Sequence, residues 1–70
     1  MSDTSIPDPH YDLVSVLYHA LQGAETIDKY LGDASGDEEL SNFFKQVKQG
    51  YDRTAQQAKQ LLVARIEHEH

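Results

Sequence analysis

Cysteine is absent from this 70-residue sequence, and proline occurs only twice. Without cysteine the chain can form neither a disulfide framework nor a zinc site with thiolate ligands. The sequence also lacks an apolar run close to the roughly 18 residues of a transmembrane helix, and its start has neither the basic nor the apolar region of a signal peptide. We therefore expect a cytoplasmic protein with no membrane partner.

Basic residues are scarce as well. Six Lys and Arg stand against twelve Asp and Glu, which gives a net charge of −6. Nucleic-acid binding needs clustered positive charge to neutralise phosphates. No glycine-rich phosphate loop and no nucleophile paired with a base is present either. We expect neither a nucleic-acid partner nor an enzyme.

The chain is also short. Seventy residues form one domain at most, and a single hydrophobic core of this size is marginal. Because disulfides are excluded, self-association or very regular helix packing must provide the missing stability.

What the sequence does contain is helical periodicity. The segment 37–67 has no proline, and its apolar residues return at steps of three or four, which at about 100° per residue form one stripe along a helix. The stripe consists of Leu40, Phe44, Val47, Tyr51, Ala55, Ala58, Leu62 and Ile66.

A second helix is predicted over 9–31. Pro9 suits the first helical position, and Asp8 before it is a good N-cap. The apolar positions alternate by four and three, the spacing that keeps two helices in contact at a shallow angle. They are Leu13, Leu17, Ala20, Ala24, Ile27 and Leu31.

The loop 32–36 separates these helices. Gly32 is the residue type that closes a helix in the left-handed conformation, and Ser35 with Glu38 has the capping-box pattern that opens one. A loop this short makes the helices antiparallel neighbours. The predicted fold is all-α, a two-helix hairpin over 9–67, with a flexible N-terminal arm at 1–8 and a frayed tail at 68–70.

A reversal at Gly32 sets the expected register. It places Pro9 opposite about Ala58 and Tyr51 opposite about Leu17, so the end of the second helix is expected to project past the first. The projecting apolar residues would be Leu61, Leu62 and Ile66.

These stripes are wider than one helix can cover. Val16 and Tyr30 extend an edge of the first, while Phe43 and Leu61 extend an edge of the second. We expect a homodimer that forms a four-helix bundle. The predicted interface residues are Leu13, Leu17, Ala20, Ala24, Phe43, Phe44, Val47, Tyr51, Ala58, Leu61, Leu62 and Ile66.

The runs LYHALQGAETIDKYL at 17–31 and DEELSNFFKQVKQGYDRTAQQAKQLL at 37–62 resemble one helical hairpin of the ferritin-like superfamily, in particular its small rubrerythrin-type members. The resemblance covers about residues 13–62 and implies a bundle architecture. That family's diiron site needs a Glu-x-x-His motif. Here the corresponding part of the second helix reads QGYDRT at 49–54, without a Glu-x-x-His, so only the architecture carries over.

Three carboxylates are nevertheless candidate metal ligands. Glu25 and Asp28 approach the apolar edge of the first helix, and in a dimer two copies of each, with Asp52, would offer hard oxygen ligands to an ion such as iron. The alternative is that each is solvated or paired with a lysine. The run Glu67–His70 could bind a divalent metal or simply be a solvated tail. Our leading expectation is that no cofactor is bound.

Gly50 beside Tyr51 breaks the local helical rules, because glycine costs about 1 kcal/mol relative to alanine in a helix. It could mark a close helix approach, a bend, or the wall of a small pocket. Three functions stay open: a homo-oligomeric interaction or accessory module, which could also serve a larger protein partner; a ferritin-like carboxylate metal binder; and a carrier of an apolar small ligand in the dimer core.

Overall fold

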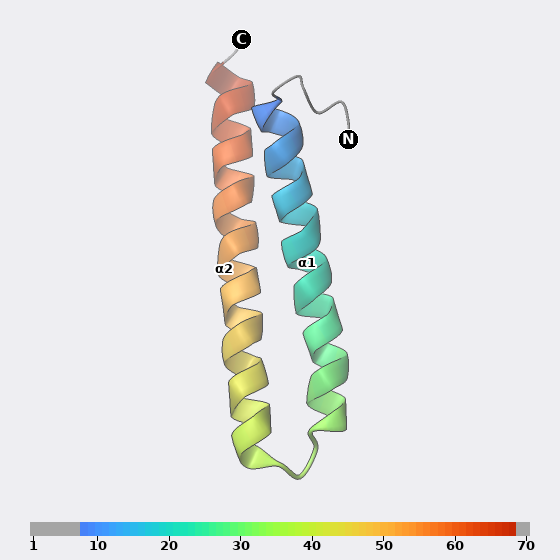
Figure 1. Ribbon diagram of the computed structural model, residues 1–70. Coiled ribbons are helices and arrows are strands. Elements are labelled where there is room, and N and C mark those ends of the chain that lie inside the picture. Colours follow the sequence, from blue (N-terminus) through green and yellow to red (C-terminus); the bar gives the residue numbers. More distant parts are fainter. Residues whose placement is uncertain (1–7, 69–70) are drawn as a thin grey trace.

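A computed structural model describes residues 8–68 of the chain. Helix α1 spans Pro9–Asp33 and helix α2 spans Glu38–His68. The two helices run antiparallel, side by side, and a short turn joins them at one end (Figure 1). The predicted all-α hairpin is confirmed. The arm expected at 1–8 and the tail at 68–70 lie outside the described residues, apart from Asp8 and His68.

The start of α1 is as predicted. Pro9 is the first helical residue, where its missing N–H has no cost, and the backbone N–H of Tyr11 donates to Asp8 Oδ1 at 3.1 Å. Asp8 therefore belongs to the helix cap and not to an arm.

The end of α1 differs from the prediction. Gly32 lies within the helix, which continues to Asp33, and the backbone N–H of Ala34 donates to the carbonyl of Tyr30 at 2.9 Å. Gly36, with φ of +93°, is the one residue of the described chain in the left-handed region. The reversal of direction occurs two to four residues later than expected, and only glycine adopts its backbone angle without strain.

The start of α2 also requires a correction. The backbone N–H of Leu40 donates to Asp37 Oδ1 at 3.1 Å, so Asp37 is the N-cap and the predicted capping box of Ser35 with Glu38 is wrong. An N-cap must directly precede the first helical residue, which is Glu38 itself. The Ser41 hydroxyl donates across the turn to the carbonyl of Ala34 at 3.1 Å.

This later turn shifts the register of the hairpin. Three contacts define it: Tyr51 with Gly23, Phe44 with Tyr30, and Lys48 with Asp28. Extended along the helices, they place Pro9 opposite about residue 65 and not opposite Ala58. The predicted overhang of Leu61 and Leu62 is wrong, because the midpoint of the hairpin lies near Gly36 and not at Gly32.

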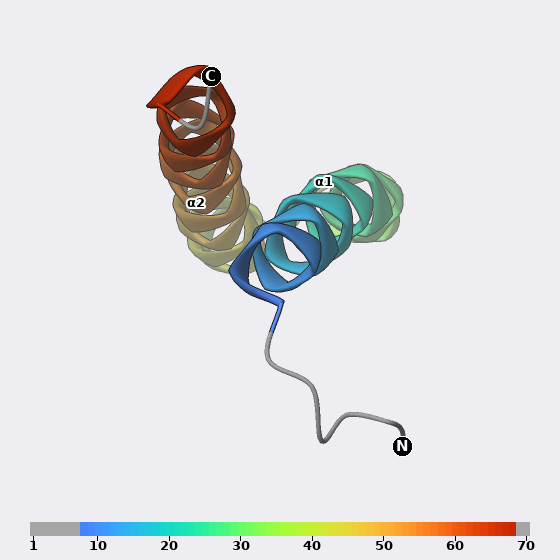
Figure 2. The same cartoon turned by 90° about the horizontal axis from the view of Figure 1, so that it is seen from above.

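The hairpin is a single layer of two helices. Its smallest Cα extent is 13 Å, and the view along the helices shows no third element packed on either side (Figure 2). Within the described chain, no stretch of either helix is both long enough and apolar enough to cross a membrane.

Small residues fill the contact between the helices. The buried apolar residues are Ala20, Ala24, Ile27, Ala34, Ala55 and Ala58. Alanine lets two helix backbones approach closely, so the larger side chains are displaced to the two sides of the contact. The large apolar residues that stay exposed are Tyr11, Val14, Val16, Tyr18, Leu21, Tyr30, Leu40, Phe43, Tyr51, Leu61, Val63 and Ile66.

Candidate interaction surface

The line of contact between α1 and α2 leaves two broad faces, one on each side. The first, here called the aromatic face, consists of Val16, Gly23, Tyr30, Leu40, Phe43, Val47, Gly50, Tyr51, Thr54 and Leu61. These residues share a side because they recur at heptad spacing along each helix and because contacts between the helices join them. None of the ten is charged.

Tyr51 is the central aromatic residue of this face. Its ring lies over Gly23 of α1, so close that a Cβ atom at position 23 would stand 2.7 Å from two ring carbons. The tyrosine is still 37% exposed. One side of the ring therefore rests on α1 while the remainder faces outward.

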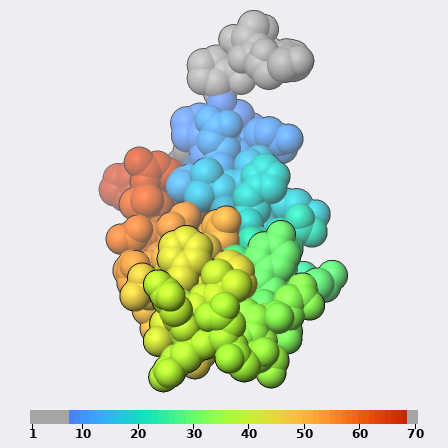
Figure 3. Space-filling model, turned by 60° about the horizontal axis from the view of Figure 1, so that its bottom comes forward, coloured from blue at the N-terminus to red at the C-terminus, as the bar shows by residue number. Residues whose placement is uncertain are grey.

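A second group of rings lies nearer the turn. The ring centroids of Tyr30 and Phe44 are 5.7 Å apart, and those of Phe43 and Phe44 are 5.9 Å apart. Such tilted geometries at this separation are favourable for aromatic pairs. Phe44 is half-buried, whereas Phe43 is 57% exposed. Bulky side chains from the end of α1 and the beginning of α2 stand together at this end of the molecule (Figure 3).

The opposite face carries charge. Lys48 Nζ donates to Asp28 Oδ1 at 2.7 Å, which joins α2 to α1. This hydrogen bond, together with the negative charge of Asp28 and a smaller effect of Asp52, raises the pKa of Lys48 above its ordinary value of 10.5. The charged form of the Lys48 ammonium group is thus stabilised by its partner on α1.

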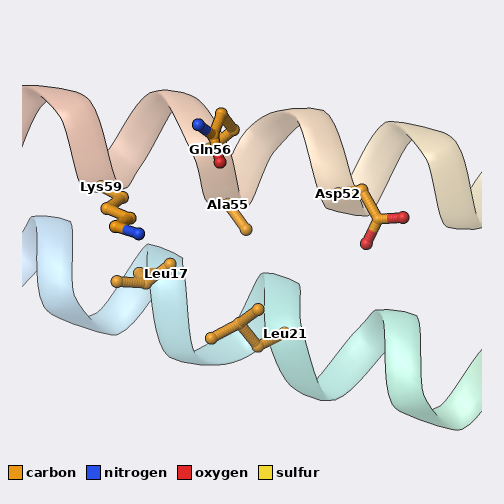
Figure 4. A pocket seen from close by; sticks show the side chains of 6 residues that line it. All are labelled: Leu17, Leu21, Asp52, Ala55, Gln56 and Lys59. Carbon is orange, nitrogen blue, oxygen red and sulfur yellow. The ribbon is translucent and has the colours of Figure 1, made fainter.

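A shallow groove of about 430 Å³ lies further along the charged face (Figure 4). Leu17 and Leu21 of α1 form one wall, beneath Ala55 of α2, and the other lining residues are Asp52, Gln56 and Lys59. Most of these side chains are exposed. The groove is part of the solvated surface between the helices and does not enclose a ligand.

The three candidate metal ligands are not brought together within the hairpin. Asp28 is bonded to Lys48, Asp52 lines the groove, and Glu25 is exposed on α1. Between residues 8 and 68, no three His, Asp or Glu side chains are grouped so as to hold a metal ion. The metal-binding hypothesis stays a prediction about a dimer.

The predicted interface residues have three different environments. Ala20, Ala24 and Ala58 are buried between α1 and α2 of one chain, so they pack the hairpin itself. Five are half-buried beside that contact: Leu13, Leu17, Phe44, Val47 and Leu62. Four are exposed and available to a partner: Phe43, Tyr51, Leu61 and Ile66.

Glycine marks a close approach, but at a different position from the one suggested by the sequence. Among the residues that the structure describes, nothing lies within 4 Å of a Cβ atom built at Gly50, whereas Gly23 is in contact with Tyr51. The sequence alone does not identify Gly23 as a contact position. Its role depends on the register of the two helices, which places an aromatic ring over it. Its heptad spacing from Val16 and Tyr30 is visible in the sequence and is the signal that could have found it.

The chain matches no protein-family model, no curated protein and no solved structure. The ferritin-like resemblance therefore remains a resemblance, and the functional argument depends on the geometry of the hairpin.

Proposed function

We propose that this chain is a homo-oligomeric interaction or accessory module, in which two hairpins associate as a four-helix bundle and which has no catalytic activity of its own. The observation that carries the proposal is an inversion of side-chain size between the inside and the outside. The fully buried residues are alanines and one isoleucine, while three leucines, one of the two phenylalanines and all four tyrosines stay exposed.

The energetics of a single hairpin support association. Full burial of a large apolar side chain contributes about 1.5–3 kcal/mol, while a buried alanine contributes much less. Hairpin formation alone therefore leaves most of the available hydrophobic free energy unused. A second hairpin packed against the first would bury these side chains and supply the stability that a 70-residue chain without cysteine lacks.

The geometry of the hairpin is also suited to a bundle. Its two helices are antiparallel and form one layer, so a second layer completes the arrangement of a four-helix bundle (Figure 1). Such a bundle would place the exposed apolar side chains of one face between the two hairpins.

The test is the mass of the full chain in solution. Sedimentation equilibrium over about 1 µM to about 1 mM should show a species of twice 7.9 kDa, and the thermal midpoint should rise with protein concentration because association stabilises only the folded state. A 7.9 kDa monomer throughout that range, with a midpoint that does not depend on concentration, would overturn the proposal.

A further inference from the structure

Helix α2 carries a second seam, beside its contact with α1, that combines four apolar residues with Gly50, Thr54 and Gln57. Its residues advance by three and four, the same spacing as in the seam that packs on α1. They are Leu40, Phe43, Val47, Gly50, Thr54, Gln57 and Leu61. A seam of this spacing fits another helix at a shallow crossing angle. Among residues 8–68, no further helix is present to pack on it.

We propose that the second copy of the chain docks on the aromatic face, with the two α2 helices packed seam against seam and closest to each other at Gly50. This inference rests on the proposed function and specifies which of the two faces is used. The contact is then isologous, with the same surface contributed by both copies.

Six exposed side chains of this face supply a large part of the apolar area that a dimer needs. An aromatic side chain buries roughly 150–250 Å², and Tyr30, Phe43 and Tyr51 are 45%, 57% and 37% exposed. Together they leave about 300 Å² of ring surface in contact with water. Three aliphatic side chains of similar exposure, Val16, Leu40 and Leu61, raise the area toward the roughly 800 Å² that each partner buries in a stable interface.

The distribution of charge favours the same face. Each chain carries a net charge of −6, so two copies repel each other unless they meet through surface that lacks charge. The ten residues of the aromatic face carry no charge, and Asp37 and Glu39 lie beside its Leu40 and Phe43 only at the turn end. Docking on the other face would remove water from the Asp28–Lys48 pair and from Asp52 and Lys59. Desolvation of such groups opposes association.

Gly50 explains where the two helices come closest. It lies in the middle of the second seam, and no atom of residues 8–68 outside its own helical surroundings lies within 4 Å of where its Cβ atom would be. Gly23, the other glycine of the aromatic face, is already covered by Tyr51. Gly50 is thus the position at which the backbone of another helix can approach without hindrance from a side chain.

Matched charge insertions on the two faces test the inference. Phe43 and Leu21 are exposed to nearly the same extent, 57% and 54%, but Phe43 lies on the aromatic face and Leu21 on the charged face. We expect Phe43→Glu to raise the dimer dissociation constant by at least about 100-fold, since it buries an unpaired carboxylate, and Leu21→Glu to change it by less than about threefold. Sedimentation equilibrium measures both.

The outcomes separate this inference from the proposed function. If the wild-type protein is a monomer, both the proposed function and the proposed docking face are wrong. A wild-type dimer that is weakened by Leu21→Glu as much as or more than by Phe43→Glu overturns the docking face and leaves the proposed function intact. A Phe43→Glu variant that associates as tightly as the wild type also overturns it.

A disulfide experiment covers the case in which Phe43→Glu fails to fold. The chain has no cysteine, so a single introduced thiol can pair only with its copy. A twofold axis at Gly50 brings the two residues 50 together whether the α2 helices run parallel or antiparallel. Mild oxidation of Gly50→Cys should give covalent dimers, while Gln49→Cys, about 100° further round the helix, should give at least about tenfold fewer. Equal or faster cross-linking at position 49 would overturn the proposal.

Discussion

The ring of Tyr51 on α2 lies over the backbone of Gly23 on α1, so closely that a side chain at position 23 would clash with the ring. A Cβ atom at position 23 would approach two ring carbons to 2.7 Å, which is closer than side-chain carbons pack. This contact fixes the longitudinal register of the hairpin near its middle. Because the ring is also part of the aromatic face, the same pair links the packing of one chain to its outer surface.

We predict that Gly23→Ala destabilises the hairpin by about 1 kcal/mol. Alanine gains about 1 kcal/mol of helix propensity over glycine, but displacement of the Tyr51 ring costs about 1–3 kcal/mol of packing. Thermal or urea unfolding followed by circular dichroism measures the difference.

Gly32→Ala is the matched control within the same helix. In the described part of the chain, nothing lies within 4 Å of a Cβ atom at position 32, so this variant should be as stable as the wild type or more so. If Gly23→Ala proved as stable as Gly32→Ala, the ring of Tyr51 would not be fixing the register.

The bond between Lys48 and Asp28 predicts a dependence of stability on alkaline pH. The pKa of Lys48 is raised in the folded state, so its contribution is complete below the ordinary pKa of 10.5 and is lost as the pH rises through the higher folded-state value. The difference in thermal midpoint between the wild type and Lys48→Gln should therefore be constant below about pH 10 and should shrink above it.

The comparison uses the difference between the two proteins and not either curve alone, because alkaline effects common to both proteins then cancel. Lys45→Gln is a control, because it removes a lysine that is exposed on the same helix. A wild-type minus Lys48→Gln difference that stays constant to about pH 12 would contradict the assignment.

The cap of α2 gives a third prediction. Asp37→Ala removes the oxygen that accepts from the N–H of Leu40 and should cost about 1 kcal/mol of unfolding free energy. Ser35→Ala should cost only a few tenths of a kcal/mol, as is usual at an exposed turn position. Chemical unfolding of both variants measures the two changes in unfolding free energy. If Ser35→Ala cost more than Asp37→Ala, Ser35 and not Asp37 would be the N-cap of α2.

The turn between the helices gives a fourth prediction. Gly36 has φ of +93°, so Gly36→Ala should cost about 1–2 kcal/mol, the strain of a Cβ atom in the left-handed region. Gly36→Asn should cost less, because asparagine tolerates this region better. Thermal unfolding of the two variants orders them, and an alanine variant as stable as the wild type would show that the chain reverses elsewhere.

The two helices and their hairpin arrangement can be predicted from the sequence because they depend on local interactions. Asp8 and Pro9 begin α1 through contacts within one turn, and the spacing of apolar residues identifies two helices because it depends only on the rotation per residue. Two long helices joined by a few residues must fold back on each other. These signals are contained in short segments, and the hairpin follows from them.

The tertiary structure alone decided the register and the division of residues between inside and outside. The turn at Gly36, and not at Gly32, shifted every pair across the hairpin and placed Tyr51 over Gly23 instead of Leu17. Hydrophobicity ranks phenylalanine above alanine, yet Ala24 is buried and Phe43 is exposed. Two helices alone come closest where their side chains are smallest, so the larger residues remain on the faces where a second layer would cover them.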